Sequence, residues 1–285
     1  MNLLSLVSNL VKLRLSIAVT LSAMTGFFIS GAAVSSSLFF MLGGVFILTC
    51  GAAALNQFTE KDTDALMKRT AGRPIPSGRI SAGAVLFTAI LLIFSGILLL
   101  AATRILPVIL GAVSVILYNF IYTRLKKITL VSVVPGALVG ALPPLIGYFS
   151  AGMTSLSISI ILFSAFMFLW QLPHFWLILI RYRADYFNAG FRTFGPGFTS
   201  RSIRILVFCW VLLTSLLLIS FSLGRVLFNP AIGYSLAALN ILFILSFYST
   251  LFGRDEGRSV NGAFILINSF SLLIMILFIL NTLIK

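Results

Sequence analysis

The sequence predicts an all-α fold, a polytopic membrane bundle of nine transmembrane helices. With 285 residues, 60% of them hydrophobic and 9% charged, and a mean hydropathy of +1.13, the chain carries more apolar surface than a soluble core can bury. Apolar stretches recur between short polar breaks, each close to the roughly 20 residues that one helical crossing needs. We expect residues 1–285 to form a single transmembrane domain.

Nine such stretches can be placed along the chain. They are continuous runs of Leu, Ile, Val, Phe and Ala, which favours helices over the alternating pattern of a membrane barrel. Arg104 and Pro107 mark the short break between the third and the fourth. The stretches cover residues 15–33, 37–58, 82–102, 105–122, 130–150, 155–180, 203–223, 229–251 and 260–283.

The basic residues predict the orientation in the membrane. With nine crossings, all of the 20 Lys and Arg residues except Arg104, Arg225 and Lys285 fall on one side. The positive-inside rule places that side, with the N-terminus, in the cytoplasm and the C-terminus outside. Topology thus accounts for the net charge of +14, and no nucleic-acid partner is needed to explain it.

Polar side chains gather where the second crossing ends. Asn56, Glu60 and Asp64 are spaced i, i+4 and i+8, which puts one amide and two carboxylates on one stripe of a helix. Asp62 falls roughly opposite Glu60 and is expected to face solvent or a basic neighbour.

Carboxylates that share one stripe repel each other unless a cation lies between them. Lys61, Lys68, Arg69 and Arg73 follow within a few residues. A Mg²⁺ ion with an anionic ligand fits this pattern, because Mg²⁺ takes one or two carboxylates and completes its shell with water and phosphate oxygens. The alternative is an interfacial charge cluster that only ends a membrane helix.

Two further loops lie on the same side, and the three loops together offer acidic, basic and hydroxyl side chains. In one, Asp185 stands among Arg181, Tyr182 and Arg183 after the sixth crossing. In the other, residues 122–129 read YTRLKKIT and offer basic side chains to an anion. We expect these loops to converge with the stripe of Asn56.

Several motifs resemble those of the UbiA superfamily of intramembrane prenyltransferases, and most closely its protoheme IX farnesyltransferase branch. The resemblance covers nearly the whole chain. The pattern NxxxExxxD formed by Asn56, Glu60 and Asp64, followed by MKRTAGRPIPSGR, is highly specific. The other segments are YTRLKK at 122–127, GALPPLIGY at 140–148, WQLPHFW at 170–176 and DYFNAG at 185–190.

This resemblance implies a central cavity with Mg²⁺ and a prenyl diphosphate at its cytoplasmic mouth. The family branch transfers the farnesyl group of farnesyl diphosphate to the vinyl group of haem B, with addition of water, giving haem O and diphosphate. Glu60 and Asp64 are expected to hold Mg²⁺, with Asn56 and Asp185 completing the catalytic and metal-binding set. The residues expected at the diphosphate are Lys68, Arg69, Arg73, Lys126 and Arg181.

The resemblance also implies the partners and the location. Haem B is a substrate and not a cofactor, and His174, the only histidine, is a candidate to bind it, although it could equally hydrogen-bond between helices. We expect a multi-pass protein of the plasma (inner) membrane of a prokaryote, with the active-site loops in the cytoplasm. A contact with a haem A synthase or a terminal oxidase is left open.

Two other functions compete with haem farnesylation. A UbiA-type enzyme could act on a quinone precursor or on another aromatic or tetrapyrrole acceptor with the same metal and diphosphate site. A transporter would instead need charges near the midplane of the bilayer, whereas every acidic residue here lies near the end of a predicted crossing. Pro143 and Pro144, inside the fifth crossing, are expected to kink a helix that lines the cavity.

Overall fold

The computed structural model describes residues 3–192, 198–223, 229–253 and 255–284, and every regular element in these ranges is helical. The chain order of the elements, including the π-helix η1 and the 3-10 helix η2, is α1 (Leu3–Leu10), α2 (Leu13–Ile29), α3 (Ser36–Thr59), α4 (Lys61–Ala65), α5 (Ala82–Ala101), α6 (Ile105–Ile116), η1 (Leu117–Tyr122), α7 (Thr123–Ile128), η2 (Leu130–Ser132), α8 (Val133–Ser150), α9 (Ile158–Arg181), α10 (Arg183–Asn188), α11 (Ser200–Leu223), α12 (Pro230–Leu251) and α13 (Glu256–Leu283).

The expected crossings correspond to these helices. Within the described ranges, eight helices are long and apolar enough to cross a membrane, and the number is nine if the pair α1 and α2, which bends by 55°, counts as one crossing. The sequence placed this first crossing at residues 15–33, whereas α2 alone covers Leu13–Ile29. The break at Arg104 lies between α5 and α6 as predicted. The fourth crossing differs from the prediction, because it continues through η1 and α7 to Ile128.

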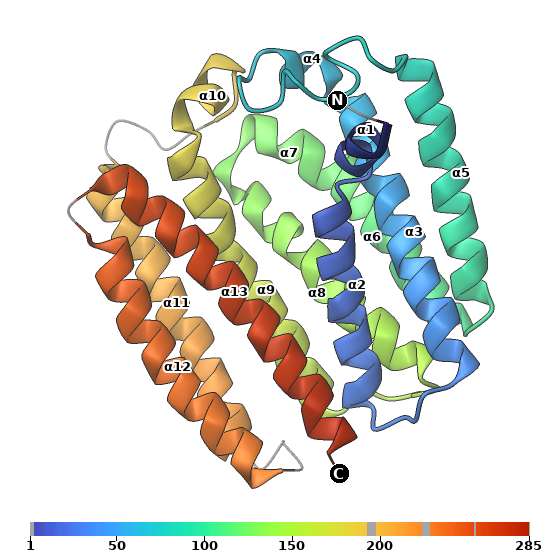
Figure 1. The fold of residues 1–285 in the computed structure, drawn as a ribbon, viewed down its shortest axis with the longest axis vertical. Coiled ribbons are helices and arrows are strands. Elements are labelled where there is room, and N and C mark those ends of the chain that lie inside the picture. Colours follow the sequence, from blue (N-terminus) through green and yellow to red (C-terminus); the bar gives the residue numbers. More distant parts are fainter. Residues whose placement is uncertain (1–2, 193–197, 224–228, 254, 285) are drawn as a thin grey trace.

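Four helices form a closed ring at the centre of the molecule. α2 contacts α8, α8 contacts α9, α9 contacts α13, and α13 contacts α2. Outside this ring, α3, α5 and α6 pack on the side of α2 and α8, whereas α11 and α12 pack on the side of α9 and α13 (Figure 1). The ring accords with a bundle built around a centre, and the expected central cavity stays a prediction.

The segments that carry the motifs gather at one end of the bundle. Figure 1 shows α1, α4, α7 and α10 at the same end as the N-terminus, with the C-terminus at the other end. The outer helix α5 exposes large apolar side chains along its length, among them Phe87 at 70% and Phe94 at 60% exposure. Such a surface suits the hydrocarbon core of a bilayer.

The two ring helices α2 and α8 touch through their backbones. A Cβ atom at Gly26 would overlap the carbonyl group of Pro144, and one at Gly147 would overlap the carbonyl oxygen of Ala23. Small residues that allow such approaches are typical of packed membrane helices. Pro143 and Pro144 lie inside α8 and are buried, so they form part of a helix and not of a loop.

Candidate active site

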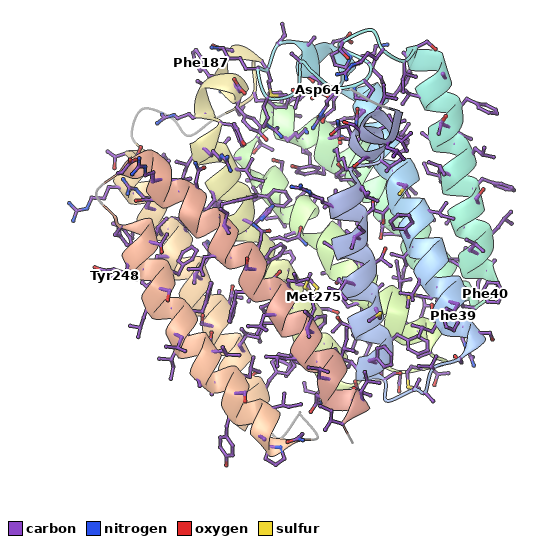
Figure 2. All side chains as sticks on the ribbon, viewed as in Figure 1. Phe39, Phe40, Asp64, Phe187, Tyr248 and Met275 are labelled. Carbon is purple, nitrogen blue, oxygen red and sulfur yellow. The ribbon has the colours of Figure 1, made fainter. Side chains whose placement is uncertain are left out.

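The polar cluster predicted at the end of the second crossing is buried at the mouth of the bundle. Helix-type hydrogen bonds run from Glu60 N to Asn56 O (3.0 Å) and from Asp64 N to Glu60 O (2.8 Å), so the stripe continues from α3 into α4. Asn56, Glu60 and Asp64 are 1%, 3% and 0% exposed, whereas Asp62 is exposed. Figure 2 places Asp64 at the end where α4 lies.

Asn56 connects three elements through its side-chain amide. Its Oδ1 accepts hydrogen bonds from Lys12 Nζ at 2.7 Å and from the Tyr118 hydroxyl at 3.2 Å. Its Nδ2 donates to Glu60 Oε2 and to Thr123 Oγ1, both at 3.1 Å. All four bonds are consistent with one orientation of the amide, and they fix the position of the Glu60 carboxylate.

Each buried carboxylate has a basic partner from a different segment. Lys126 Nζ of α7 lies 2.5 Å from Glu60 Oε1, and Arg73 of the loop after α4 lies 2.5 Å from Asp64 Oδ2. Thr70 Oγ1 donates to the backbone oxygen of Asp64 at 2.9 Å and ties that loop to α4. The structure thus brings four predicted site residues into direct pairs.

The two carboxylates differ in their electrostatics. Burial acts to raise the pKa of Glu60, but the Lys126 ammonium, with Lys12 and Arg73 further away, brings it below its usual value. Burial raises the pKa of Asp64 above its ordinary value, although Arg73 acts in the opposite direction. Glu60 is therefore the more firmly ionised of the two.

The donor set fits a hard divalent cation that arrives with an anionic ligand. Asp64 Oδ1 is buried and accepts no hydrogen bond, so one carboxylate oxygen has an open coordination position. Among the described residues, no three His, Cys, Asp or Glu side chains lie close enough to hold a metal by themselves. Two carboxylates supplemented by phosphate oxygens and water match the habits of Mg²⁺.

Asp185 reaches the same mouth from α10 but meets a different partner. Its Oδ2 accepts a hydrogen bond from the backbone N–H of Arg69 at 3.2 Å, and it does not join Glu60 and Asp64 in a three-carboxylate group. The guanidinium groups of Arg69 and Arg181 lie 4.9 and 5.1 Å from the ring centroid of Tyr182. Lys68 is exposed. The roles of these residues stay predictions.

His174 lies deeper, on the face of α9 that meets α13. At 1.5 Å per residue it is about 10 Å below Arg181 along the helix. Its ring packs between Trp170 and Phe264, with centroid distances of 5.1 and 5.0 Å. The imidazole has a side-chain hydrogen bond with Asn268 of α13, so the expected contact between helices is present, while its Nδ1 is buried and makes no hydrogen bond. An imidazole nitrogen without a partner is compatible with the expected haem contact.

Comparison with known proteins identifies the family. A family model described as the UbiA prenyltransferase family matches residues 19–281, which is nearly the whole chain. The chain belongs to the UbiA prenyltransferase family. It is therefore a prenyltransferase with the membrane-embedded helical fold of that family.

Curated relatives place this UbiA prenyltransferase in the protoheme IX farnesyltransferase branch. A protein of that name from Geobacter sulfurreducens is 41% identical over 184 residues, which cover 65% of this chain and 68% of the relative. One from Christiangramia forsetii is 31% identical over 100% of this chain and 95% of the relative. One from Acidiphilium cryptum is 34% identical over 88% and 80%.

Solved structures of UbiA proteins share the fold at low sequence identity. A UbiA homologue from Archaeoglobus fulgidus bound to GPP and Mg²⁺ matches with a TM-score of 0.70 and 17% identity, over 95% of this chain and 97% of that chain. A structure described for digeranylgeranylglyceryl phosphate synthase matches with a TM-score of 0.78 and 14% identity, over 99% of both chains. These likenesses establish the fold alone.

Sequence reasoning assigned no role to three members of this cluster, Lys12, Tyr118 and Thr123, although Thr123 lies in the segment 122–127 that carries the resemblance. Lys12 was attributed to topology only, yet its Nζ contacts Asn56 Oδ1 and lies 3.0 Å from the Tyr118 hydroxyl. Tyr118 lies in η1, and a π-helical turn within a longer helix often accompanies a functional site. The charge of Lys12 beside the first apolar stretch is a signal that could have drawn attention to it in the sequence.

Proposed function

We propose that this protein is a Mg²⁺-dependent protoheme IX farnesyltransferase, which joins the farnesyl group of farnesyl diphosphate to the vinyl group of haem B. Water is added in the same reaction, and the products are haem O and diphosphate. The observation that carries the proposal is the pair of buried carboxylates, Glu60 and Asp64, each 2.5 Å from a basic side chain at the mouth of an apolar bundle. The curated relatives support haem B as the acceptor.

The ion pairs suit the capture of a metal together with a diphosphate. Glu60 and Asp64 would hold Mg²⁺, which neutralises the leaving diphosphate when it is bound. Lys126 and Arg73 then turn from the carboxylates to phosphate oxygens, and Arg69 binds the same anion from the edge of the loop. The carboxylates are screened by these basic groups while the substrate is away, so little charge repulsion builds up in a buried site.

The bond changes require charge stabilisation and a dry surrounding. As the bond between C1 of the farnesyl group and the diphosphate oxygen breaks, positive charge develops on the allyl group and negative charge on the leaving group. The vinyl group attacks C1, water then adds its oxygen to the resulting cation, and one proton is released. The rings of Tyr118 and Tyr122, stacked at 6.0 Å, and Phe175 offer π faces beside the ion pairs.

The apolar chain and the charged diphosphate of the prenyl substrate favour a reaction at the membrane surface. The farnesyl chain can enter the apolar bundle while its diphosphate stays at the polar mouth. We assign His174 to the acceptor side, because its unpaired Nδ1 lies about 10 Å deeper than Arg181. We place the mouth in the cytoplasm of a prokaryote, on the inner membrane, from the distribution of basic residues.

The direct test supplies membranes that contain the protein with haem B, farnesyl diphosphate and Mg²⁺, and separates the haems by mass. We expect a farnesylhydroxyethyl haem that is absent with EDTA and absent with Glu60→Gln. Asp62→Gln is the matched control, because that carboxylate is exposed on the opposite side of α4. Binding of farnesyl diphosphate without a haem product would instead indicate another prenyl acceptor.

A further inference from the structure

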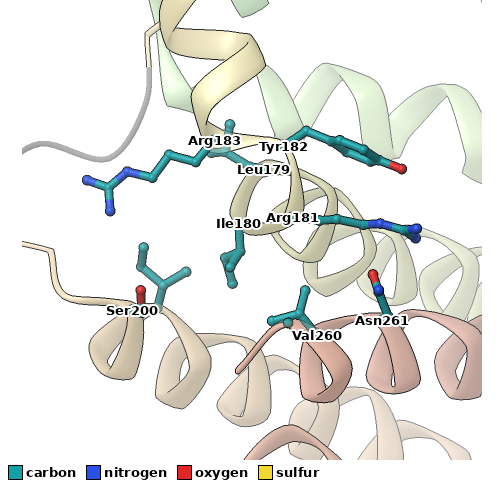
Figure 3. Close-up of a pocket in the computed structure, with 10 residues that line it drawn as sticks. Leu179, Ile180, Arg181, Tyr182, Arg183, Ser200, Val260 and Asn261 are labelled. Atoms are coloured by element: carbon teal, nitrogen blue, oxygen red, sulfur yellow. The ribbon is translucent and has the colours of Figure 1, made fainter. Parts of the chain in front are cut away.

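A pocket lies at the same end of the bundle, outside the carboxylate cluster. It has a volume of about 420 Å³ and forms where the end of α9 meets the beginnings of α11 and α13 (Figure 3). Its ten described lining residues are Leu179, Ile180, Arg181, Tyr182, Arg183, Ser200, Ile203, Gly257, Val260 and Asn261.

The lining of this pocket has the chemistry of a site for an anion on an apolar body. Two of the lining residues are arginines and none is acidic, while Ile180, Ile203 and Val260 form an apolar wall. In Figure 3 the two arginines point in different directions, Arg181 from the end of α9 toward Asn261 and Arg183 from the beginning of α10 toward the side of Ser200. Two separated guanidinium groups suit a ligand with two separate carboxylates.

Asn261 supplies a second polar observation. Its Oδ1 is buried and accepts no hydrogen bond, so this oxygen can take a donor such as water or the neighbouring Arg181 guanidinium. The Nδ2 of the same amide can donate to a carboxylate beside Arg181. The pocket therefore combines charge with an incompletely satisfied amide.

The pocket is connected to both halves of the proposed reaction. The guanidinium groups of Arg181 and Arg69 are each about 5 Å from the ring centroid of Tyr182 (5.1 and 4.9 Å), so they lie at most about 10 Å apart. Arg69 belongs to the loop whose Arg73 pairs with Asp64. On α13, Asn261 lies about one turn from Phe264, which packs on His174. Through Asn261 and Phe264 the pocket therefore neighbours the part of α13 that packs on His174.

We propose that this pocket binds the two propionate carboxylates of the haem acceptor and so directs the opposite part of the porphyrin, with its vinyl groups, into the bundle. Arg181, expected from the sequence at the diphosphate, is thereby assigned to the haem. The proposal rests on the function proposed above. A phospholipid headgroup has similar chemistry, an anion on an apolar body. The connection through Tyr182 to Arg69 favours the substrate, because a lipid anchor needs no link to the diphosphate loop.

The experiment compares haem B with its propionate dimethyl ester, which keeps the vinyl groups and lacks both charges. Wild type, Arg183→Gln and the control Arg201→Gln are assayed in nanodiscs, and KM is measured for each acceptor and for farnesyl diphosphate. Arg201 is exposed and does not line the pocket, although it follows Ser200 directly.

We expect the ester to raise KM for the wild type roughly tenfold or more, the usual effect of losing a charge-assisted hydrogen bond. Arg183→Gln should raise KM for haem B by a similar factor, leave KM for the ester almost unchanged, and leave KM for farnesyl diphosphate unchanged. Arg201→Gln should match the wild type. This pattern of lost discrimination is specific to a carboxylate contact, since a general structural defect would affect both acceptors.

Several results would overturn the proposal. Equal KM values of the wild type for haem B and its ester would do so, and so would equal effects of Arg183→Gln on both acceptors. The assay is repeated in nanodiscs without anionic phospholipid; an effect of Arg183→Gln that disappears there would assign the pocket to a lipid phosphate. If the wild type makes no prenylated haem, the proposed function fails. The proposal for the pocket is then tested by absorbance titrations, which give the Kd of the wild type and of each variant for haem B and for its dimethyl ester.

Discussion

Asn56 was expected to be a metal ligand, but its side-chain amide is fully hydrogen-bonded within the site. Both lone-pair directions of its oxygen and both hydrogens of its nitrogen have partners, so it holds Glu60 in place and leaves no atom open toward a metal. Its expected part as a metal ligand therefore needs a rearrangement of Lys12 or Tyr118. In this structure its evident effect is on the orientation of the carboxylate.

The open oxygen of Asp64 leads to a prediction at the residue scale. Asp64→Asn keeps the size of the side chain but removes the charge that would bind Mg²⁺, so we expect turnover to fall by roughly 100-fold or more while folded protein is still recovered. Haem O formation and the yield of monodisperse protein are measured together. Asp62→Asn, on the exposed side of α4, should retain activity. Parallel loss of activity and folded protein would make Asp64 structural.

Lys12 is the basis of a second residue-scale prediction. Its ammonium is the shortest contact of Asn56 Oδ1, at 2.7 Å, and its backbone holds a left-handed φ of 48° that directs the chain from α1 into α2. Lys12→Met should lower kcat about tenfold or more, because Asn56 and with it Glu60 lose one fixed contact.

Arg14→Met provides the comparison for Lys12→Met, since it removes a basic residue two positions away that is exposed. The kcat values of both variants are measured with saturating farnesyl diphosphate. Full activity of Lys12→Met would show that Lys12 has no role in the site and contributes only to the orientation of the protein in the membrane.

At the scale of elements, the sequence predicted the positions of the helices better than their internal details. Runs of apolar residues locate a helix because the bilayer requires its backbone to be bonded internally. The same rule carries no information on the π-helix at Leu117–Tyr122, which rotates Tyr118 toward Asn56. Nor does it indicate the 55° bend between α1 and α2, since both parts are equally apolar.

The contact between α2 and α8 gives a prediction at the element scale. Gly147→Ala adds a Cβ that would overlap the carbonyl oxygen of Ala23, so the helices must separate, and we expect a loss of about 1–3 kcal/mol in stability. Gly83→Ala, where no atom lies within 4 Å of the added Cβ, should leave stability unchanged or slightly higher. Thermal unfolding in detergent compares the two. Equal melting temperatures would contradict the close contact.

At the scale of the whole molecule, the i, i+4, i+8 spacing predicted which carboxylates would lie together, because helix-type hydrogen bonds continue from α3 through Glu60 into α4 and keep the three residues on one stripe. The pairs of Glu60 with Lys126 and of Asn56 with Lys12 could not be predicted. Their members are 66 and 44 positions apart in the sequence, and only tertiary packing brings them together. Charge counting predicted the collection of basic loops at one end. The family motifs predicted the chemistry assigned to that end.

The orientation of the whole bundle is open to a labelling test. In a variant without native cysteines, made with Cys50→Ala and Cys209→Ala, a cysteine is placed at Ser35 or at Asp62, both exposed and at opposite ends. The positive-inside rule predicts that an impermeant maleimide labels Ser35→Cys in intact bacterial cells and labels Asp62→Cys only after permeabilisation. The reverse pattern would place the polar mouth outside the cell.

The backbone contact between α2 and α8 also makes this side of the central ring stiffer than a side where the helices touch through side chains. Where Gly26 meets Pro144, no side chain lies between the two helices that could change rotamer and let them move apart. On the neighbouring side of the ring, α13 reaches α2 through side chains such as Thr282, which donates to Phe28 O at 2.9 Å. We therefore expect thermal motion of the ring helices to be largest in α13. Amide hydrogen exchange should be slowest in the backbone around Gly26 and Gly147.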